Sequence, residues 1–187
     1  MTITKKTVVN LNMKKLMIIM ALLLSMAAQA QNDQLAQIRK QYAEAKKQVA
    51  FIDKNPEMLG FGHTEVTNNY ATAGSGSVKE TIHYYYRGKT DERTEEFYLF
   101  PFLVTRKYTV GADDHYEEYL YNECGDGIAF FFQKNEYGET RYYWNTCADK
   151  NFFHEDIRGD RGLDEVFAAR QAADFKEVFD KLMNRNY

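Results

Sequence analysis

Three short segments of this chain carry side chains of the kinds that bind metal ions. They are His63 with Glu65, residues 113–115 (Asp-Asp-His) and residues 154–156 (His-Glu-Asp). A zinc site needs three or four such ligands that converge on one point. No two histidines of the chain stand four residues apart, as they would on one face of a helix. We therefore expect these groups to be solvated turn residues, and we expect no metal or other cofactor.

Four glutamates, Glu95, Glu96, Glu117 and Glu118, fall in segments that we expect to be strands. Two carboxyl groups that face one cleft would suit glycoside hydrolysis. Neighbouring strand residues point to opposite faces, however, and charges on edge strands commonly serve to block aggregation. A periplasmic hydrolase that acts through paired carboxylates is therefore the alternative to a protein without catalytic activity, which we favour.

Few residues of the chain could act as nucleophiles. Ser75 and Ser77 lie in a Gly-Ser stretch typical of a linker, without the strand and helix that flank a nucleophilic serine. Cys124 and Cys147 each follow an aromatic run, and an even number of cysteines in an exported chain favours a disulfide bond between them. Two free thiols are the alternative, because alternate strands of a sheet lie about 10 Å apart.

The elements that must position these residues begin with an amphipathic helix. Asn32 or Asp33 can cap its start, and Asn55 with Pro56 ends it. Apolar residues recur in it at spacings of three and four and therefore lie on one stripe: Leu35, Ile38, Tyr42, Ala45, Val49 and Ile52.

From Phe61 to Phe153 the pattern changes to short aromatic and β-branched runs separated by turn residues, which is typical of an antiparallel meander. Pro101 interrupts one long run and marks a bulge, a bend or a sheet edge. The run Ile128–Phe132 is apolar without alternation, so both faces of the sheet need cover there. The expected strands are His63–Tyr70, Val78–Tyr86, Glu95–Phe100, Phe102–Val110, His115–Tyr121, Gly127–Gln133, Glu139–Asn145 and Asn151–His154.

A second helix is expected from about Leu163 to Met183, with Asp160 or Gly162 at its start. Because helices precede and follow the strands instead of alternating with them, the fold class is α+β, a meander of about six to eight strands with the C-terminal helix packed on it. The expected apolar side of this helix consists of Leu163, Val166, Phe167, Phe175, Val178, Phe179 and Leu182.

The strand region also carries one resemblance. Glu118–Asn122 leads through Gly125–Gly127 into Ile128–Phe132, and Thr140–Asn145 follows. This succession resembles the aromatic hairpin units of uncharacterised exported bacterial β-meander proteins, in which a Tyr-Tyr-x-Asn or Tyr-Tyr-x-Asp run precedes a glycine turn and another strand. The resemblance implies the sheet fold and no known activity. This chain departs from those units by placing cysteines in the turns.

The first 30 residues have the features of an export signal. Met13 is followed by two lysines and an apolar run from Leu16 to Leu24, and small residues stand at Ala28 and Ala30. We expect cleavage between Ala30 and Gln31. The apolar run is about a dozen residues, short of the roughly 20 that span a bilayer, so we expect no permanent membrane anchor.

We expect translation to start at Met13, because Met-Lys-Lys followed by an apolar stretch already makes a complete signal; Met1 is the alternative. Residues 1–30 are then a leader and a cleaved signal peptide, and residues 31–187 are a single domain. The mature chain should be periplasmic or secreted.

Charge excludes one class of partner for the mature chain. Removing residues 1–30 takes away four of the 24 basic residues and none of the 27 acidic ones, which leaves a net charge of −7. Nucleic-acid binding needs a clustered basic face, so we exclude it.

The leading hypothesis is an exported, non-enzymatic binding or interaction domain, whose partner is a protein or polysaccharide of the cell envelope. A structural subunit of an envelope assembly is a further alternative. Large rigid aromatics contribute most to binding where they are desolvated. The expected contact surface on the sheet is therefore Tyr84, Tyr86, Tyr142 and Trp144.

Overall fold

The structure, a computed structural model, describes residues 29, 32–56, 58–72, 76–91, 93–122, 127–144, 151–158 and 164–184, with the backbone only for Thr72 and residues 151–158. The expected signal segment, residues 1–30, lies outside these residues except for Gln29. The chain divides into two compact units, Met1–Gln37 and Ile38–Tyr187, and all strands belong to the second. No helix among the described residues has the length and apolar character needed to cross a membrane.

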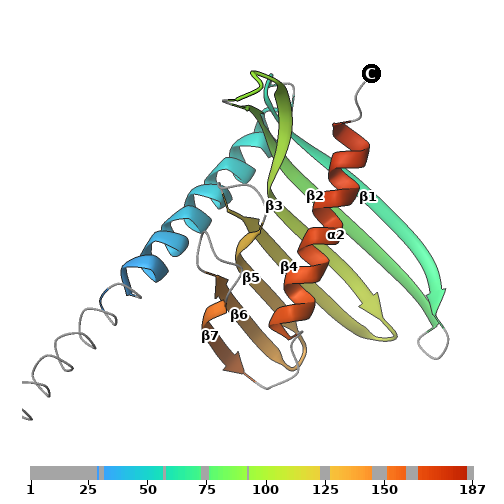
Figure 1. The fold of residues 1–187 in the computed structure, drawn as a ribbon. Coiled ribbons are helices and arrows are strands. Elements are labelled where there is room, and N and C mark those ends of the chain that lie inside the picture. Colours follow the sequence, from blue (N-terminus) through green and yellow to red (C-terminus); the bar gives the residue numbers. More distant parts are fainter. Residues whose placement is uncertain are drawn as a thin grey trace, which may run out of the picture. The chain divides into compact units, whose positions relative to one another are not determined.

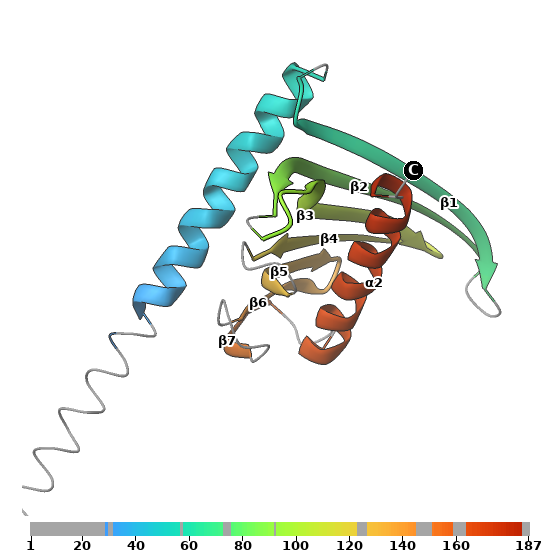
Figure 2. The same cartoon turned by 45° about the horizontal axis from the view of Figure 1, so that its top comes forward.

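Seven antiparallel strands form one sheet in which each strand pairs with the next along the chain (Figures 1 and 2). The predicted α+β fold, an antiparallel meander with a helix before and after it, is confirmed. The strands are β1 (Phe61–Thr72), β2 (Gly76–Thr90), β3 (Phe97–Val110), β4 (Asp113–Tyr121), β5 (Ile128–Asn135), β6 (Gly138–Trp144) and β7 (Asn151–Arg158).

The two segments predicted on either side of Pro101 form a single strand, β3. Tyr85 of β2 pairs with Leu103 and Tyr86 pairs with Pro101, so Phe102 is an extra residue in a β-bulge. Strand β4 pairs with β3 only from Leu103 onward. Pro101, which has no N–H to donate, lies outside the segment of β3 that pairs with β4, so the β3–β4 ladder loses no hydrogen bond. Of the three predicted possibilities at Pro101, the bulge is confirmed.

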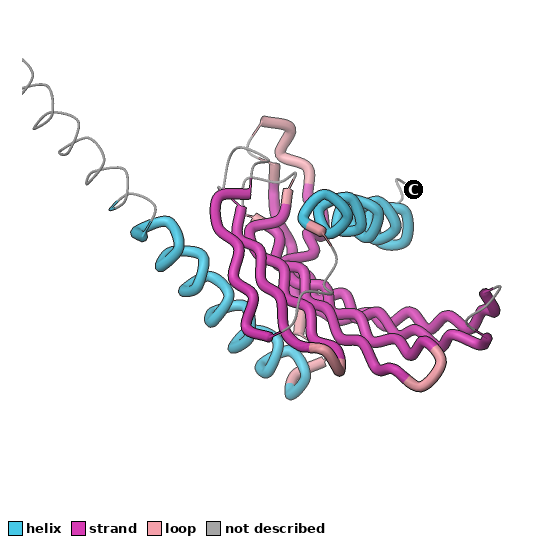
Figure 3. Tube along the Cα trace, turned by 90° about the horizontal axis from the view of Figure 1, so that it is seen from below, coloured by secondary structure: helices cyan, strands magenta, loops and turns pink. Residues whose placement is uncertain are grey.

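Helix α2 (Glu165–Met183) lies along one face of the sheet (Figure 3). At its start the carboxylate of Asp164 accepts a hydrogen bond from the N–H of Phe167 at 2.8 Å, which is an N-cap. After its last turn the side-chain amide of Asn184 donates to the carbonyl of Leu99 at 2.8 Å and accepts from its N–H at 2.9 Å. Both ends of the helix are thus fixed by side-chain hydrogen bonds.

The buried side of α2 agrees with the prediction at Phe175 and Phe179 and differs from it elsewhere. Val166 and Phe167 are 72% and 50% exposed, Val178 and Leu182 are exposed as well, and Leu163 lies outside the described residues. The physical reason is the small size of alanine, which lets the helix approach a sheet face rich in tyrosines. The hydroxyl of Tyr121 accordingly donates to a carbonyl oxygen of the helix at 2.6 Å. The buried residues are Ala168, Ala172, Phe175 and Phe179.

Residues 32–54 form the predicted N-terminal helix, and those from Ile38 on belong to the same unit as the sheet. Ile38, Ala45 and Ile52 are buried, as the apolar stripe predicted. The ring of Tyr42 packs on that of Phe130, with centroids 4.6 Å apart.

Glu118 of β4 connects this helix to the sheet. Its buried carboxylate accepts hydrogen bonds from the hydroxyl of Tyr42 at 2.6 Å and from the hydroxyl of Tyr116 at 2.5 Å, and Lys46 Nζ lies 2.9 Å from it. Burial, together with the Glu118 charge, raises the pKa of both tyrosines, so both hydroxyls stay protonated and donate. Charge-assisted hydrogen bonds of this kind are the stronger ones.

Glu117, the preceding residue, points to the opposite face and is fully buried there. Its carboxylate accepts from the hydroxyls of Tyr108 and Tyr119 at 2.9 and 2.7 Å, and from the amide of Gln133 at 3.3 Å. The hydroxyl of Tyr119 also lies 2.9 Å from the side-chain oxygen of Gln171 in α2. Glu117 therefore stands at the centre of the polar contacts beneath α2.

Arg106 supplies the positive charge of this buried network. Its guanidinium contacts Glu117 at 3.3 Å and also donates to Glu80, whose other oxygen accepts from Asn68 at 3.1 Å. Burial alone would lower the pKa of Arg106, but the two carboxylates raise it above its ordinary value. One buried cation thus compensates two buried anions from neighbouring strands.

Replacing this cation should be costly. We expect Arg106→Met to lower the free energy of unfolding by about 3 to 5 kcal/mol, because Glu80 and Glu117 would be left buried without a counter-charge. Urea unfolding followed by circular dichroism measures the change. The matched control is Arg93→Met at an exposed position, which should change stability by no more than about 0.5 kcal/mol. Equal effects of the two substitutions would contradict this account of the network.

Candidate functional site

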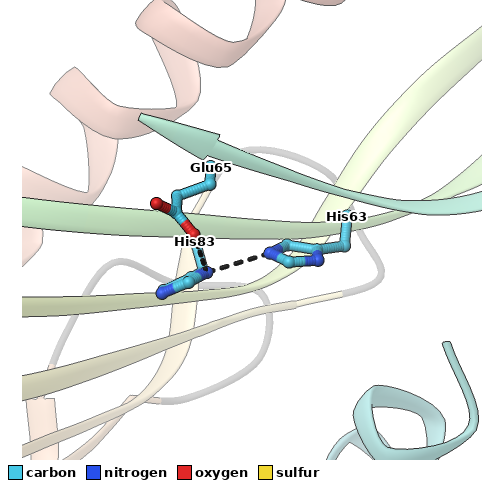
Figure 4. A group of neighbouring side chains, drawn as sticks. All are labelled: His63, Glu65 and His83. Carbon is cyan, nitrogen blue, oxygen red and sulfur yellow. Dashed lines mark hydrogen bonds and ion pairs between the residues drawn. The ribbon is translucent and has the colours of Figure 1, made fainter. Parts of the chain in front are cut away.

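Two histidines and a glutamate meet on the outer hairpin of the sheet (Figure 4). Glu65 of β1 is the cross-strand partner of His83 in β2, and His63 lies two residues before Glu65 on the same face. His63 Nε2 lies 2.9 Å from His83 Nδ1, and that nitrogen lies 3.7 Å from Glu65 Oε2. We call these three residues the histidine cluster. One ligand atom from each of the three residues lies within 4.8 Å of the other two.

The surroundings of the histidine cluster fix its rings and its charge. The ring of Tyr85 stacks on that of His63, with centroids 4.9 Å apart and planes at 15°. Burial and the neighbouring His63 lower the pKa of His83, with Glu65 and Asp53 acting in the opposite direction. Burial, then Asp53, raises the pKa of Tyr85 to about 12. The lowered pKa favours the neutral imidazole form of His83, which can offer a lone pair.

A pocket of about 420 Å³ lies further along the same face. One row of cross-strand neighbours runs across it from β2 to β5: Thr81, Lys107, Tyr116 and Lys134. A second row adds Lys79, Thr109 and Asp114, and Tyr108, His115 and Asn135 complete the lining. We call it the lysine pocket, because lysines from three separate strands line it.

The lysines of this pocket are exposed. Among the described residues, Lys79 and Lys107 have no carboxylate within ion-pair distance, while Lys134 Nζ lies 3.4 Å from a carboxylate oxygen of Glu139. Lys107 lies over the ring of Tyr116, 5.9 Å from its centroid. The pocket thus presents three ammonium groups, against one carboxylate of its own lining, Asp114.

The predicted carboxylate candidates do not share an open cleft. Glu117 and Glu118 face opposite sides of β4, as expected, but β4 is an inner strand and both side chains are buried, so the interpretation as edge-strand charges is wrong. Glu95 and Glu96 precede β3 in exposed positions instead of lying on a strand. The described part of the chain therefore offers no support for a hydrolase that uses these four residues.

The structure places three of the four predicted contact aromatics in the core. Tyr84 is 1% exposed and packs against Phe175 and Phe179 of α2. Tyr142 and Trp144 are 7% and 4% exposed, with ring centroids 5.8 Å apart. Their burial gives no support to an aromatic contact surface on this part of the sheet.

Tyr86, the fourth, is partly exposed and lies across Gly62 of β1. A Cβ at position 62 would come within 2.3 Å of the Tyr86 ring, so this ring position requires glycine opposite it. The ring also packs on Phe179, with centroids 5.5 Å apart. Tyr86 of β2 therefore contacts both β1 and α2.

The remaining predicted groups fall into two sets. Cys124, Cys147 and the side chains of residues 154–156 lie outside the described residues, so the disulfide stays a prediction. The segment 113–115 opens β4, where the ring of His115 stacks on Tyr108 with centroids 4.6 Å apart. The Asp114 carboxylate accepts from the hydroxyl of Thr109 at 2.9 Å.

Comparison with known protein families, curated proteins and solved structures gave no match.

The sequence analysis did not predict that His83 lies beside His63 and Glu65, although the sequence contained a signal for this arrangement. His63 and Glu65 are two apart in an expected strand, and His83 lies in the expected strand that follows the Gly-Ser turn. Pairing the hairpin about that turn would have set Glu65 opposite His83, as observed. The lysine pocket had no comparable signal, because its residues come from four strands whose mutual register the sequence does not specify.

Proposed function

We propose that this chain is an exported, non-enzymatic binding domain and that its ligand is an acidic saccharide held in the lysine pocket. The observation that carries the proposal is the convergence of Lys79, Lys107 and Lys134, from three strands, on one pocket of about 420 Å³. That volume lies in the range of about 300 to 1,000 Å³ usual for small-ligand sites.

The rest of the lining favours a ligand that is both anionic and rich in hydroxyl groups. The lysine ammonium groups only donate hydrogen bonds, whereas the Asp114 carboxylate accepts them. A ligand matched to both must carry negative charge and also donate hydrogen bonds. A sugar acid does so through its carboxylate or sulfate and its hydroxyls.

The overall charge supports a specific pocket over a general attraction to anions. The chain without residues 1–30 carries a net charge of −7, so its long-range field repels acidic polymers. Electrostatic attraction of an acidic polymer is then confined to the part of the sheet that carries the three lysines. This attraction should weaken as salt screens the exposed charges.

The export half of the proposal is supported by the sequence between Met13 and Ala30, with its basic start, apolar middle and small residues at the expected cleavage point. Export would bring the protein to the compartment that contains the polysaccharides of the cell envelope, which agrees with the proposed ligand.

The first prediction from the proposed function concerns the pocket lysines. In the triple variant Lys79→Gln, Lys107→Gln, Lys134→Gln, the affinity for polygalacturonate should fall about tenfold. Each exposed charge pair contributes roughly 0.5 kcal/mol, and about 1.4 kcal/mol corresponds to a factor of ten. Calorimetric titration at two salt concentrations measures both the affinity and its salt dependence.

The matched control for that experiment carries the same change in net charge elsewhere. Lys40, Lys47 and Lys54 are exposed on the N-terminal helix, and their replacement by glutamine should leave the affinity for polygalacturonate within twofold of the unaltered protein's. Equal losses in the two triple variants would show that only net charge matters, and no measurable binding by the unaltered protein would reject an acidic saccharide as the ligand.

The second prediction concerns export. When the full chain is expressed in a bacterium and fractionated, the protein released from the envelope should begin at Gln31. Intact mass spectrometry determines the terminus. Protein that stays in the cytoplasm with residues 13–30 attached would contradict this prediction.

A further inference from the structure

We infer that the histidine cluster, His63, Glu65 and His83, is a binding site for a divalent transition-metal ion of the zinc and copper class. The site goes beyond the proposed saccharide binding and uses none of the pocket lysines. It combines two imidazole nitrogens and a carboxylate oxygen, a ligand set found in zinc sites that keep one coordination position open.

The spacing of the ligand atoms already approaches that of a metal site. Two imidazole nitrogens bound to zinc at about 2.0 to 2.1 Å lie about 3.3 Å apart in a tetrahedral site and about 2.9 Å apart where the bonds meet at a right angle. His63 Nε2 and His83 Nδ1 are 2.9 Å apart, and Glu65 Oε2 is 3.7 Å from the latter. The third separation is no more than 4.8 Å, so the side chains would have to close it by up to about 1.5 Å to reach tetrahedral spacing.

The three ligands are held by the sheet instead of by a loop. Glu65 and His83 are direct cross-strand partners on one face, and residues two apart on a strand share that face. The stacked ring of Tyr85 limits rotation of the His63 imidazole. A ligand set on paired strands loses little conformational entropy when the metal binds.

The position is also accessible and has a further carboxylate near it. His63 and Glu65 are exposed, and His83 is partly exposed. Asp53, near the end of the N-terminal helix, acts electrostatically on both His83 and Tyr85. Such outer carboxylates commonly orient ligating histidines. Water or a ligand atom would complete the coordination from the solvent side.

The donor set indicates which ions the cluster would take. Imidazole suits zinc, copper and nickel, whereas magnesium and calcium prefer sites made of oxygen atoms alone. We therefore expect Zn²⁺ and Cu²⁺ to bind and Mg²⁺ and Ca²⁺ to leave the cluster unoccupied at the same concentrations.

The test uses untagged protein purified after expression of the full chain, because an added histidine tag would itself bind these ions. Free thiols are alkylated and metal is removed with a chelator. Titration calorimetry with Zn²⁺ should then give one site per chain. His63→Gln and His83→Gln should each weaken Zn²⁺ binding at least about tenfold, the lower end of what even outer partners of a metal contribute.

His115→Gln is the matched control, because that histidine stacks on Tyr108 away from the cluster, and it should leave Zn²⁺ affinity unchanged. Thermal unfolding verifies that each variant is folded. Electron paramagnetic resonance of the unaltered protein with Cu²⁺ provides an independent readout and should show two coordinated nitrogens. Absence of one-to-one binding, unchanged affinity in both cluster variants, or a copper spectrum without two nitrogens would overturn the inference.

Discussion

The structure depends on two consecutive buried carboxylates in an inner strand. Glu117 and Glu118 of β4 point to opposite faces of the sheet, and each collects hydrogen-bond donors from the side it faces. Burying a carboxylate costs several kcal/mol unless it is fully hydrogen-bonded, so each glutamate requires its donors to be in place. One of those donors, Tyr42, comes from the N-terminal helix, while Tyr119 links Glu117 to Gln171 of α2. A pair of adjacent residues thus sets the position of both helices.

The two faces of the sheet are covered by different helices, and this difference determines where a ligand can bind. Beneath α2, Arg106 pairs with both Glu117 and Glu80, and the rings of Tyr119 and Phe175 beside this network are buried. On the other face, the helix from Ile38 onward covers the part of the sheet near Glu118 and Phe130. The lysine pocket and the histidine cluster lie beyond that contact on the same face. The proposed functions therefore belong to the part of this face that the helix leaves open, with the histidine cluster next to Asp53 near the end of that helix.

Much of the fold could be predicted because its signals are local. The spacing of apolar residues in 32–54, the turn residues between strands and the bulge at Pro101 each act within a few positions, and the structure confirms them. The buried side of α2 was predicted only at Phe175 and Phe179. The rest depends on which sheet residues face the helix, and small alanines are buried where Val166 and Phe167 were expected. The candidate sites depend still more on strand register, since both are made of residues from different strands. From the sequence alone, Glu117 would be expected at the surface, because most of the groups that donate hydrogen bonds to it come from other elements.

The claim that each buried glutamate fixes the helix on its own face can be tested most directly by hydrogen exchange. Amide exchange is measured by mass spectrometry in the unaltered protein and in the variants Glu117→Gln and Glu118→Gln. The account predicts faster exchange in residues 38–54 for the Glu118 variant with α2 protected as before, and faster exchange in residues 165–183 for the Glu117 variant with the N-terminal helix protected as before. Identical changes in both helices for both variants, or no change in either, would contradict it.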